Sequence, residues 1–330
     1  MNKSLSILQR ISAVLVLGVS SVTVWADYPV SITHKFGTIT LTDAPTRVVS
    51  VGYSDQDDLL ALGIKPVAIR DWYGDMPFAT WPWAQDELGS ATPVVLSRDA
   101  LDFEAIAALQ PDLIVGISSG MSADDYAKLS KIAPTLAQSA DYIEYGMPWQ
   151  ERTLWIGQAL DQTESATALV ARIEQRIAQE KSAHPEFQDK QAAVAFYYSG
   201  QPGVYSSSDL RSRLLTQLGF QIPSVYDELA GASFYASFSE ERLDLLNVDV
   251  LLWLSASDAL NAADAIPMRQ FMPFYQQGRE VFVGDTLGGA FSFLSPLSIE
   301  FLLDNLIPEL ELAVDGDPTT VVPSSLSDHQ

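Results

Sequence analysis

The sequence predicts an α/β protein of two lobes, each a mainly parallel sheet flanked by helices, with one long helix joining the lobes and a cleft between them. Short apolar runs alternate with helical segments in both halves of the chain, and an unbroken helical stretch of about 19 residues separates the halves. One spaced residue pattern occurs in each half. The length of 330 residues also suggests two domains, at roughly 150 residues each.

The first 26 residues are expected to be a cleaved secretory signal. Lys3 and Arg10 precede the apolar run Ile11–Val24, and Val24-Trp25-Ala26 has small side chains at the two positions that a signal peptidase reads. The run is shorter than the roughly 20 residues that span a bilayer, so cleavage is favoured over a membrane anchor. The predicted division is signal 1–26, N-terminal lobe 27–160, linking helix 161–186, C-terminal lobe 187–314 and mobile tail 315–330.

Strands and helices alternate on both sides of the linking helix. Apolar and β-branched runs predict strands at 32–41, 47–51, 66–69, 112–115, 192–197, 250–254 and 280–283. Helical spacing predicts helices at 57–63, 103–109, 163–181, 211–218 and 298–306. The helix at 163–181 contains no Gly or Pro and is the predicted rigid link between the lobes.

Composition excludes several functional classes. The chain has 19 Lys and Arg against 42 Asp and Glu, a net charge of −23, which repels nucleic acids and anionic membrane surfaces. It has no Cys, so disulfides and thiolate sites are excluded. The three histidines, His34, His184 and His329, are far apart in sequence, and we expect no protein-held metal and no cofactor.

Gly116-Ile117-Ser118-Ser119-Gly120 matches the G-x-S-x-G pattern of serine hydrolases and follows a predicted strand. A serine nucleophile needs a histidine base that follows it in the chain. His184 precedes Pro185 at the end of the linking helix, and His329 is the penultimate residue. A turn of small residues is therefore favoured, no enzyme is expected, and a secreted serine hydrolase using Ser118 stays a weaker alternative.

Aromatic and arginine side chains follow the predicted strands. In parallel sheets, ligands bind at the carboxyl ends of strands, so these residues are expected to line the cleft. Rings supply apolar area, and Arg side chains donate to carboxylate, catecholate or hydroxamate oxygens. The predicted ligand-binding residues are Tyr53, Arg70, Trp72, Tyr73, Trp83, Arg98, Trp149, Tyr198, Arg211 and Tyr235.

The repeated pattern places one glutamate in each half. Glu104-x-Ile106-x-x-Leu109-x-x-Asp112-x-Ile114 recurs with the same offsets as Glu241-x-Leu243-x-x-Leu246-x-x-Asp249-x-Leu251. The pattern indicates either that the two halves are similar in structure or that two α/β units match by chance. In each copy the glutamate begins a predicted helix, where the helix dipole also favours a carboxylate.

Three segments carry a family resemblance: Ala44-Pro45-Thr46-Arg47-Val48-Val49-Ser50, Leu59-Leu60-Ala61-Leu62-Gly63-Ile64-Lys65-Pro66-Val67 and, most specific, 103–115 with Pro111-Asp112-Leu113-Ile114. The chain resembles the periplasmic substrate-binding proteins of iron–siderophore ABC transporters, the two-lobed class with a single long linking helix. The resemblance implies capture of a ferric siderophore in the periplasm and its delivery to an inner-membrane ABC permease for iron uptake. It also implies permease docking through Glu104 and Glu241, with Glu240 as the alternative to Glu241, and iron ligation by the siderophore's own oxygens.

The net charge of the chain indicates which type of iron chelate it binds. Without the signal the chain has 17 basic and 42 acidic residues, so a neutral or cationic ferric hydroxamate or mixed-donor chelate is favoured over an anionic tris-catecholate. A haem or cobalamin carrier of the same class is the main alternative, and a cell-surface adhesion module is another. The absence of Cys fits a soluble periplasmic form, expected to be a monomer, rather than a lipoprotein.

Overall fold

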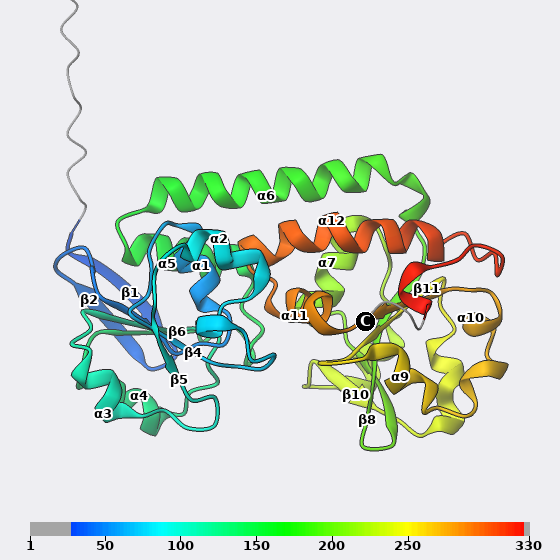
Figure 1. Cartoon of the computed structure of the whole chain (residues 1–330), viewed down its shortest axis with the longest axis horizontal. Coiled ribbons are helices and arrows are strands. Elements are labelled where there is room, and N and C mark those ends of the chain that lie inside the picture. The colour runs from blue at the N-terminus through cyan, green and yellow to red at the C-terminus, as the bar shows by residue number, and fades with distance from the viewer. Residues whose placement is uncertain (1–27, 327–330) are drawn as a thin grey trace, which may run out of the picture.

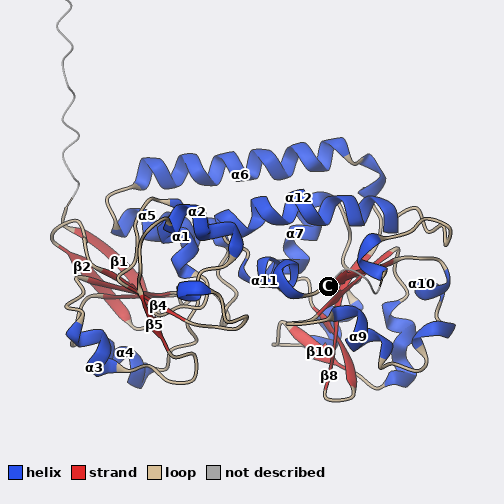
Figure 2. Ribbon diagram, viewed as in Figure 1, coloured by secondary structure: helices blue, strands red, loops and turns tan. Residues whose placement is uncertain are grey.

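The computed structural model describes residues 28–326. The signal predicted at 1–26 and residues 327–330 lie outside this range. In the part described, no helix combines the length and the apolar character needed to cross a membrane. Two five-stranded sheets with their helices form two lobes, which lie side by side beneath two long helices (Figures 1 and 2).

The sheet of the N-terminal lobe is entirely parallel. Its strand order is β5-β4-β3-β6-β7, so β3 is central and its successors lie on both sides of it. A separate antiparallel hairpin, β1-β2, replaces the single strand predicted at 32–41, because the chain reverses at 35–36 before Gly37, whose φ is +135°. The elements are β1 (Val30–His34), β2 (Gly37–Leu41), β3 (Val48–Ser50), α1 (Asp55–Ala61), β4 (Ala68–Arg70), η1 (Pro77–Ala79), η2 (Pro82–Ala84), α2 (Gln85–Leu88), β5 (Val94–Leu96), α3 (Phe103–Ala108), β6 (Leu113–Gly116), α4 (Ala123–Leu129), β7 (Thr135–Ala137) and α5 (Trp149–Ala159).

The sheet of the C-terminal lobe is mixed. Its order is β10-β9-β8-β11-β12, with β8, β11 and β12 parallel and an antiparallel β9-β10 edge that the sequence did not predict. The two-lobed fold with mainly parallel sheets is thus confirmed. The elements are β8 (Ala192–Tyr198), β9 (Gln201–Tyr205), α7 (Leu210–Leu218), α8 (Val225–Ala230), β10 (Tyr235–Ser237), η4 (Glu240–Leu246), β11 (Val250–Leu254), α9 (Ala259–Asp264), η5 (Arg269–Phe271), α10 (Pro273–Gln276), β12 (Glu280–Val283), α11 (Asp285–Phe293), α12 (Pro296–Ala313) and η6 (Pro323–Ser325).

The predicted linking helix is α6 (Thr163–Ala183), which runs along both lobes at the top of Figure 1 and is followed by η3 (Pro185–Phe187). Its buried positions recur at helical spacing, and the helix packs against α5, α7 and α12 beneath it. Although α12 comes from the C-terminal part of the chain, it also packs against α1 and η2 of the N-terminal lobe. The chain therefore passes from the N-terminal to the C-terminal lobe through α6, and with α12 it comes back into contact with the N-terminal lobe.

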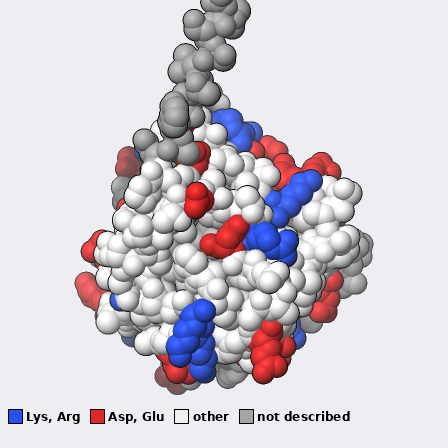
Figure 3. All heavy atoms as spheres, turned by 90° about the vertical axis from the view of Figure 1, so that its left-hand side faces the viewer, with Lys and Arg blue, Asp and Glu red and all other residues white. Residues whose placement is uncertain are grey.

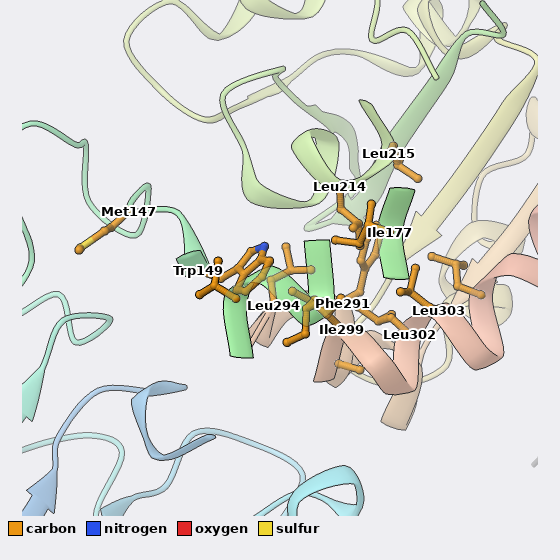
Figure 4. Close-up of a cluster of buried hydrophobic side chains, with 14 of the residues drawn as sticks. Met147, Trp149, Ile177, Leu214, Leu215, Phe291, Leu294, Ile299, Leu302 and Leu303 are labelled. Atoms are coloured by element: carbon orange, nitrogen blue, oxygen red, sulfur yellow. The ribbon is translucent and has the colours of Figure 1, made fainter. Parts of the chain in front are cut away.

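One hydrophobic core runs continuously through both lobes. Figure 4 shows its middle, where Ile177 of α6 lies against Leu214 and Leu215 of α7, with Leu302 and Leu303 of α12 beside them. Smaller clusters fill the far side of each sheet. Because burial at this junction excludes water from side chains of three helices, the lobes are packed together and do not hang from a flexible linker.

The repeated pattern has a structural counterpart. Asp112 accepts hydrogen bonds from the backbone N–H groups of Thr46 and Arg47, 2.8 Å each, just before central strand β3. Asp249 accepts from the N–H of Gln191 at 2.8 Å, just before central strand β8. These hydrogen bonds, together with one from the Thr46 hydroxyl, hold the pKa of Asp112 below its usual value, although burial opposes them. The two halves therefore share one device for fixing the start of the middle strand.

The segment predicted as a mobile tail is packed where it is described. Val322 is buried, and the Ser324 hydroxyl oxygen accepts a hydrogen bond from the backbone N–H of Phe282 in β12 at 3.0 Å. The backbone N–H of Ser324 donates to Glu309 of α12 at 3.1 Å. Polar composition alone suggested mobility, but one buried valine and these hydrogen bonds attach residues 315–326 to the C-terminal lobe.

Candidate functional site

A cavity of about 530 Å³ lies between the lobes. A second cavity of about 220 Å³ adjoins it and shares Tyr53, Trp72, Arg211 and Ser292 with it. Both lobes contribute to the larger one, and these volumes suit a small-molecule ligand. Its lining residues are Tyr53, Trp72, Tyr73, Arg98 and Asp99 of the N-terminal lobe, and Tyr205, Arg211, Leu254, Ser255, Ala256 and Ser292 of the C-terminal lobe.

The N-terminal wall forms where the strand order reverses. Tyr53 follows central strand β3 and Ser118 follows its neighbour β6, and the backbone N–H of Tyr53 donates to the Ser118 carbonyl oxygen at 3.0 Å. Ligands of open parallel sheets bind at such a switch point, at the carboxyl ends of the strands. Of the ten predicted ligand-binding residues, the structure brings five to the larger cavity: Tyr53, Trp72, Tyr73, Arg98 and Arg211.

Arg70 and Trp83 lie behind the cavity wall and do not line it. The Arg70 guanidinium is buried 4.4 Å from the centre of the Tyr53 ring and donates to the Arg98 carbonyl oxygen at 2.8 Å. Trp83 stacks on Trp81 and donates from Nε1 to Asp57 at 2.7 Å. Arg70 thus supports two residues that do reach the cavity, whereas Trp83 belongs to the packing behind it.

Three more of the predicted residues do not line the larger cavity: Trp149, Tyr198 and Tyr235. Trp149 begins α5 within the continuous core, on the side of a separate pocket beside α7. Tyr198 is 76% exposed at the β8-β9 turn, and Tyr235, on edge strand β10, packs against Phe196. For Tyr198 and Tyr235 the loop-after-strand argument fails because both lie in antiparallel strand pairs of the second sheet, whereas Trp149 begins a helix and packs into the core.

The same argument would have found residues that were missed. Ser255 and Ala256 directly follow β11, and Ser292 belongs to α11, which begins after β12. Tyr205 ends antiparallel strand β9, to which the argument does not apply, and the centre of its ring lies 4.0 Å from the Arg211 guanidinium. The search for aromatic and arginine residues overlooked the serines Ser255 and Ser292. Considering every residue that follows a strand, whatever its type, would have included Ser255.

The charges of the two cavities balance. Arg98, Arg152 and Arg211 line them together with Asp99, Glu144 and Asp209. Arg211 binds Asp209 through two hydrogen bonds of 2.8 Å, and although burial lowers the pKa of Arg211, this carboxylate raises it overall. Burial also raises the pKa of Tyr73 to about 12, so this phenol stays neutral. The cleft is locally neutral inside a strongly acidic protein.

Beneath the cleft lies a buried polar cluster that we call the hinge network: Asp55, Asp57, Asp58, Arg152 and Ser295. Arg152 donates to Asp58 at 2.7 Å and, across the lobes, to the Leu294 carbonyl oxygen at 3.1 Å. Asp57 accepts from the Ser295 hydroxyl at 2.6 Å. Three carboxylates with no exposed surface thus share one guanidinium, and two of the contacts join the lobes.

Close packing fixes this network in position. A Cβ on Gly52 would lie 2.0 Å from a carboxylate oxygen of Asp55, so only glycine allows α1 to begin so near β3. Asp55 accepts from the backbone N–H of Ser118 at 3.1 Å. Burial raises the pKa of Asp55, and it raises that of Asp58 to about 6 although Arg152 opposes this.

The raised pKa of the Asp57 carboxyl should be visible in how the stability of the protein depends on pH. Burial raises its pKa to about 7, against about 3.9 for an unfolded aspartate. The folded protein then binds more protons between about pH 4 and 7, so the free energy of unfolding falls as pH rises through that window, by up to about 1.4 kcal/mol per pH unit for this group. Urea unfolding of Asp57→Asn at several pH values should show a shallower fall and higher stability than wild type above pH 7. Equal slopes in the two proteins would contradict this.

Ser118 lies at the floor of the smaller cavity, but its surroundings are not those of a nucleophile. Its hydroxyl oxygen accepts from Arg152 at 3.3 Å. His34 contacts Tyr126, and His184 lies beside Phe187. Within residues 28–326, therefore, no histidine reaches Ser118, and the hydrolase alternative has no base.

Glu104 and Glu241 are both exposed. Glu104 lies in the first turn of α3, where the Asp102 side chain caps the helix, and Glu241 lies in η4. Neighbouring Glu240 is only half exposed and accepts from the Tyr197 hydroxyl at 2.8 Å. In Figure 1, α3 and strand β10, which η4 follows, lie on the side opposite α6. The two glutamates thus lie on separate lobes.

The outer end of the N-terminal lobe shows how the surface charge is spread. In Figure 3, acidic and basic side chains are scattered over this face, singly or in small mixed groups, among uncharged residues. Over the described residues of this face there is no continuous basic area of the kind that binds nucleic acid.

Comparisons with known proteins cover both lobes. The sequence profile of the family described as "Periplasmic binding protein" matches residues 48–280. The "Probable siderophore-binding lipoprotein YfiY" of Bacillus subtilis (strain 168) is 27% identical over 234 residues, 68% of this chain and 68% of that protein. A periplasmic solute binding protein from Mycobacterium smegmatis str. MC2 155 has 38% identity and a TM-score of 0.75, over 86% of this chain and 98% of that one. PiaA of Streptococcus pneumoniae TIGR4, solved with ferrichrome, has 26% identity and a TM-score of 0.74, over 87% and 99%.

Proposed function

The chain belongs to the periplasmic binding protein family, and from this premise we propose that it captures a ferric siderophore in the periplasm and delivers it to an inner-membrane ABC permease. The observation that carries the proposal is the cavity between the lobes, lined by tyrosine and tryptophan rings and by two arginines. Rings cover the apolar parts of a bulky chelate, and guanidinium groups donate to its oxygens. The similarity to a protein described as siderophore-binding and to one solved with ferrichrome supports the same class of ligand.

The local charge favours a neutral chelate. Each arginine of the larger cavity has an aspartate beside it, Asp99 for Arg98 and Asp209 for Arg211. An anionic tris-catecholate would have to enter a protein of high negative charge without a surplus of positive charge in the cleft. We therefore propose a ferric hydroxamate or a mixed-donor chelate, with iron held by the siderophore's own oxygens.

Delivery is proposed to use one glutamate of each lobe. Glu104 and Glu241 are exposed, and equivalent positions in the repeat place one on each lobe. Exposed carboxylates pair readily with arginines of a partner, and such pairs set orientation as well as attraction. We propose Glu241 rather than Glu240, because the Tyr197 hydroxyl already occupies the Glu240 carboxylate.

A fluorescence titration tests the ligand class. Trp72 lines both cavities, so ferrichrome should quench the tryptophan emission of the purified protein and saturate at one equivalent, whereas haemin and cobalamin should not. Trp72→Phe should lose much of the quenching, while Trp155→Phe, in α5 and outside the cavities, should keep it. Saturable quenching by haemin or cobalamin alone would instead assign the protein to the haem or cobalamin carriers. Absence of binding to all three would contradict the proposal and favour an adhesion module.

A further inference from the structure

A second polar cluster lies far from the cleft, where the linking helix ends. It contains His184, the residue after α6, together with Glu186 of η3 and Glu311 of α12. The ligand atoms of these three side chains lie within 4.8 Å of one another, and no other set of three or more His, Cys, Asp or Glu among residues 28–326 meets this condition. From this geometry we propose that the protein binds one Zn²⁺ ion between His184, Glu186 and Glu311.

The distances match a coordination sphere. His184 Nδ1 lies 3.0 Å from an oxygen of Glu186 and 3.2 Å from an oxygen of Glu311. Two ligand atoms that are each roughly 2.0–2.2 Å from a tetrahedral Zn²⁺ lie roughly 3.3–3.5 Å apart. The two distances from Nδ1 are within a few tenths of an ångström of these values, and all three ligand atoms lie within 4.8 Å of one another, so an ion could be held by a closing movement of the glutamate side chains, with one position left for water.

The imidazole is already oriented. Its other nitrogen, Nε2, lies 3.4 Å from Glu180, and Arg176 donates to that same glutamate at 2.7 Å. A ligating histidine commonly donates its second N–H to a carboxylate, which fixes the tautomer and the ring. The ring also stacks on Phe187, which is buried and stacks in turn on Phe220. Nδ1 is thus held toward the two carboxylates by contacts outside the ligand set.

Charge favours a cation at this point. The carboxylates of Glu180, Glu186 and Glu311 surround one imidazole, and Arg176 is the cation paired with this group on the Glu180 side. Imidazole nitrogen and carboxylate oxygen are ligands that Zn²⁺ accepts. A proton on Nδ1 competes with the ion for this nitrogen, so binding should weaken as the solution becomes more acidic. The ion would join the end of α6 to α12.

Calorimetric titration of the chelator-treated protein with zinc chloride at pH 7.5 tests the site. We expect one saturable equivalent, which weakens by at least tenfold at pH 5.5. Glu311→Gln should weaken it by at least tenfold and His184→Ala should remove it, while Glu180→Gln, which removes the carboxylate that orients the ring and one nearby negative charge, should cost roughly tenfold.

Glu300→Gln is the matched control, since it removes the same charge from α12 at a residue that pairs with Arg172 instead. Binding by this variant should equal wild type. A second readout replaces Zn²⁺ with Co²⁺ and measures the visible absorption of the bound Co²⁺. This absorption reports a low-symmetry site containing nitrogen, and it should vanish in Glu311→Gln. Unsaturable uptake of several zinc ions, or equal losses in Glu300→Gln and Glu311→Gln, would overturn the proposal, because either result means general attraction to an acidic surface.

Discussion

Replacing Arg152 with methionine is expected to lower the free energy of unfolding by about 3–5 kcal/mol, the usual effect of removing one partner of a buried ion pair. Arg152 is 2% exposed and binds Asp58, the Ser54 and Ser118 hydroxyls and the Leu294 carbonyl oxygen. Without it, three buried carboxylates lose their shared cation. Urea unfolding at pH 7 measures the change.

Two further variants identify the cause. Arg172→Met removes an exposed arginine that pairs with Glu300, and it should change stability by less than about 1 kcal/mol. Adding Asp58→Asn to Arg152→Met removes one uncompensated charge and should recover part of the loss. A loss below about 1 kcal/mol in Arg152→Met, or no recovery in the double variant, would mean that the hinge network contributes little to stability.

Reversing the charge of both Glu104 and Glu241 to lysine is expected to abolish siderophore-dependent iron uptake and leave chelate binding unchanged. Both side chains are exposed and lie outside the cavities, so neither folding nor the cleft should be affected. Under the proposed docking, lysine on each lobe would meet basic residues of the partner instead of pairing with them, and like charges at an interface repel. Iron uptake is measured with radioactively labelled ferric siderophore in cells carrying the variant. Chelate binding is measured by the fluorescence titration of the purified protein.

The single variants should show intermediate uptake, because each leaves one lobe able to dock. Glu87→Lys, an exposed glutamate of α2 outside the repeat, is the matched control and should transport normally. Normal uptake by the double variant would exclude docking through these residues. Impaired uptake together with impaired chelate binding would instead indicate a damaged fold.

The sequence predicted strands β3, β4, β6, β8, β11 and β12 and helices α1, α3, α7 and α12, because burial determines residue type there. Strands such as β6 and β11 are buried over nearly their whole length, and the apolar runs record this directly. It also predicted α6, whose apolar face follows helical spacing along its length. Residues 32–41 were predicted as one strand instead of a hairpin, and strands β5, β7, β9 and β10 were not predicted, since each has only three to five residues and so a short apolar run.

The candidate site was only half predictable. An aromatic residue after a strand can face the cleft, as Trp72 does, or the core, as Trp149 does, and the sequence reads the same in both cases. The hinge network was not predicted at all. Its aspartates resemble ordinary first-turn carboxylates of α1, but residues distant in sequence cover them: Ser118 for Asp55, Arg152 for Asp58 and Ser295, 238 positions later, for Asp57.

The return of α12 to the N-terminal lobe has a consequence for biosynthesis. Leu60 of α1 and Leu88 of α2 obtain part of their apolar cover from Leu297, near the start of that helix. A nascent N-terminal lobe therefore lacks this apolar cover until almost the entire polypeptide has been synthesised and can fold. Maturation should be late and concerted, with both halves reaching their final state together.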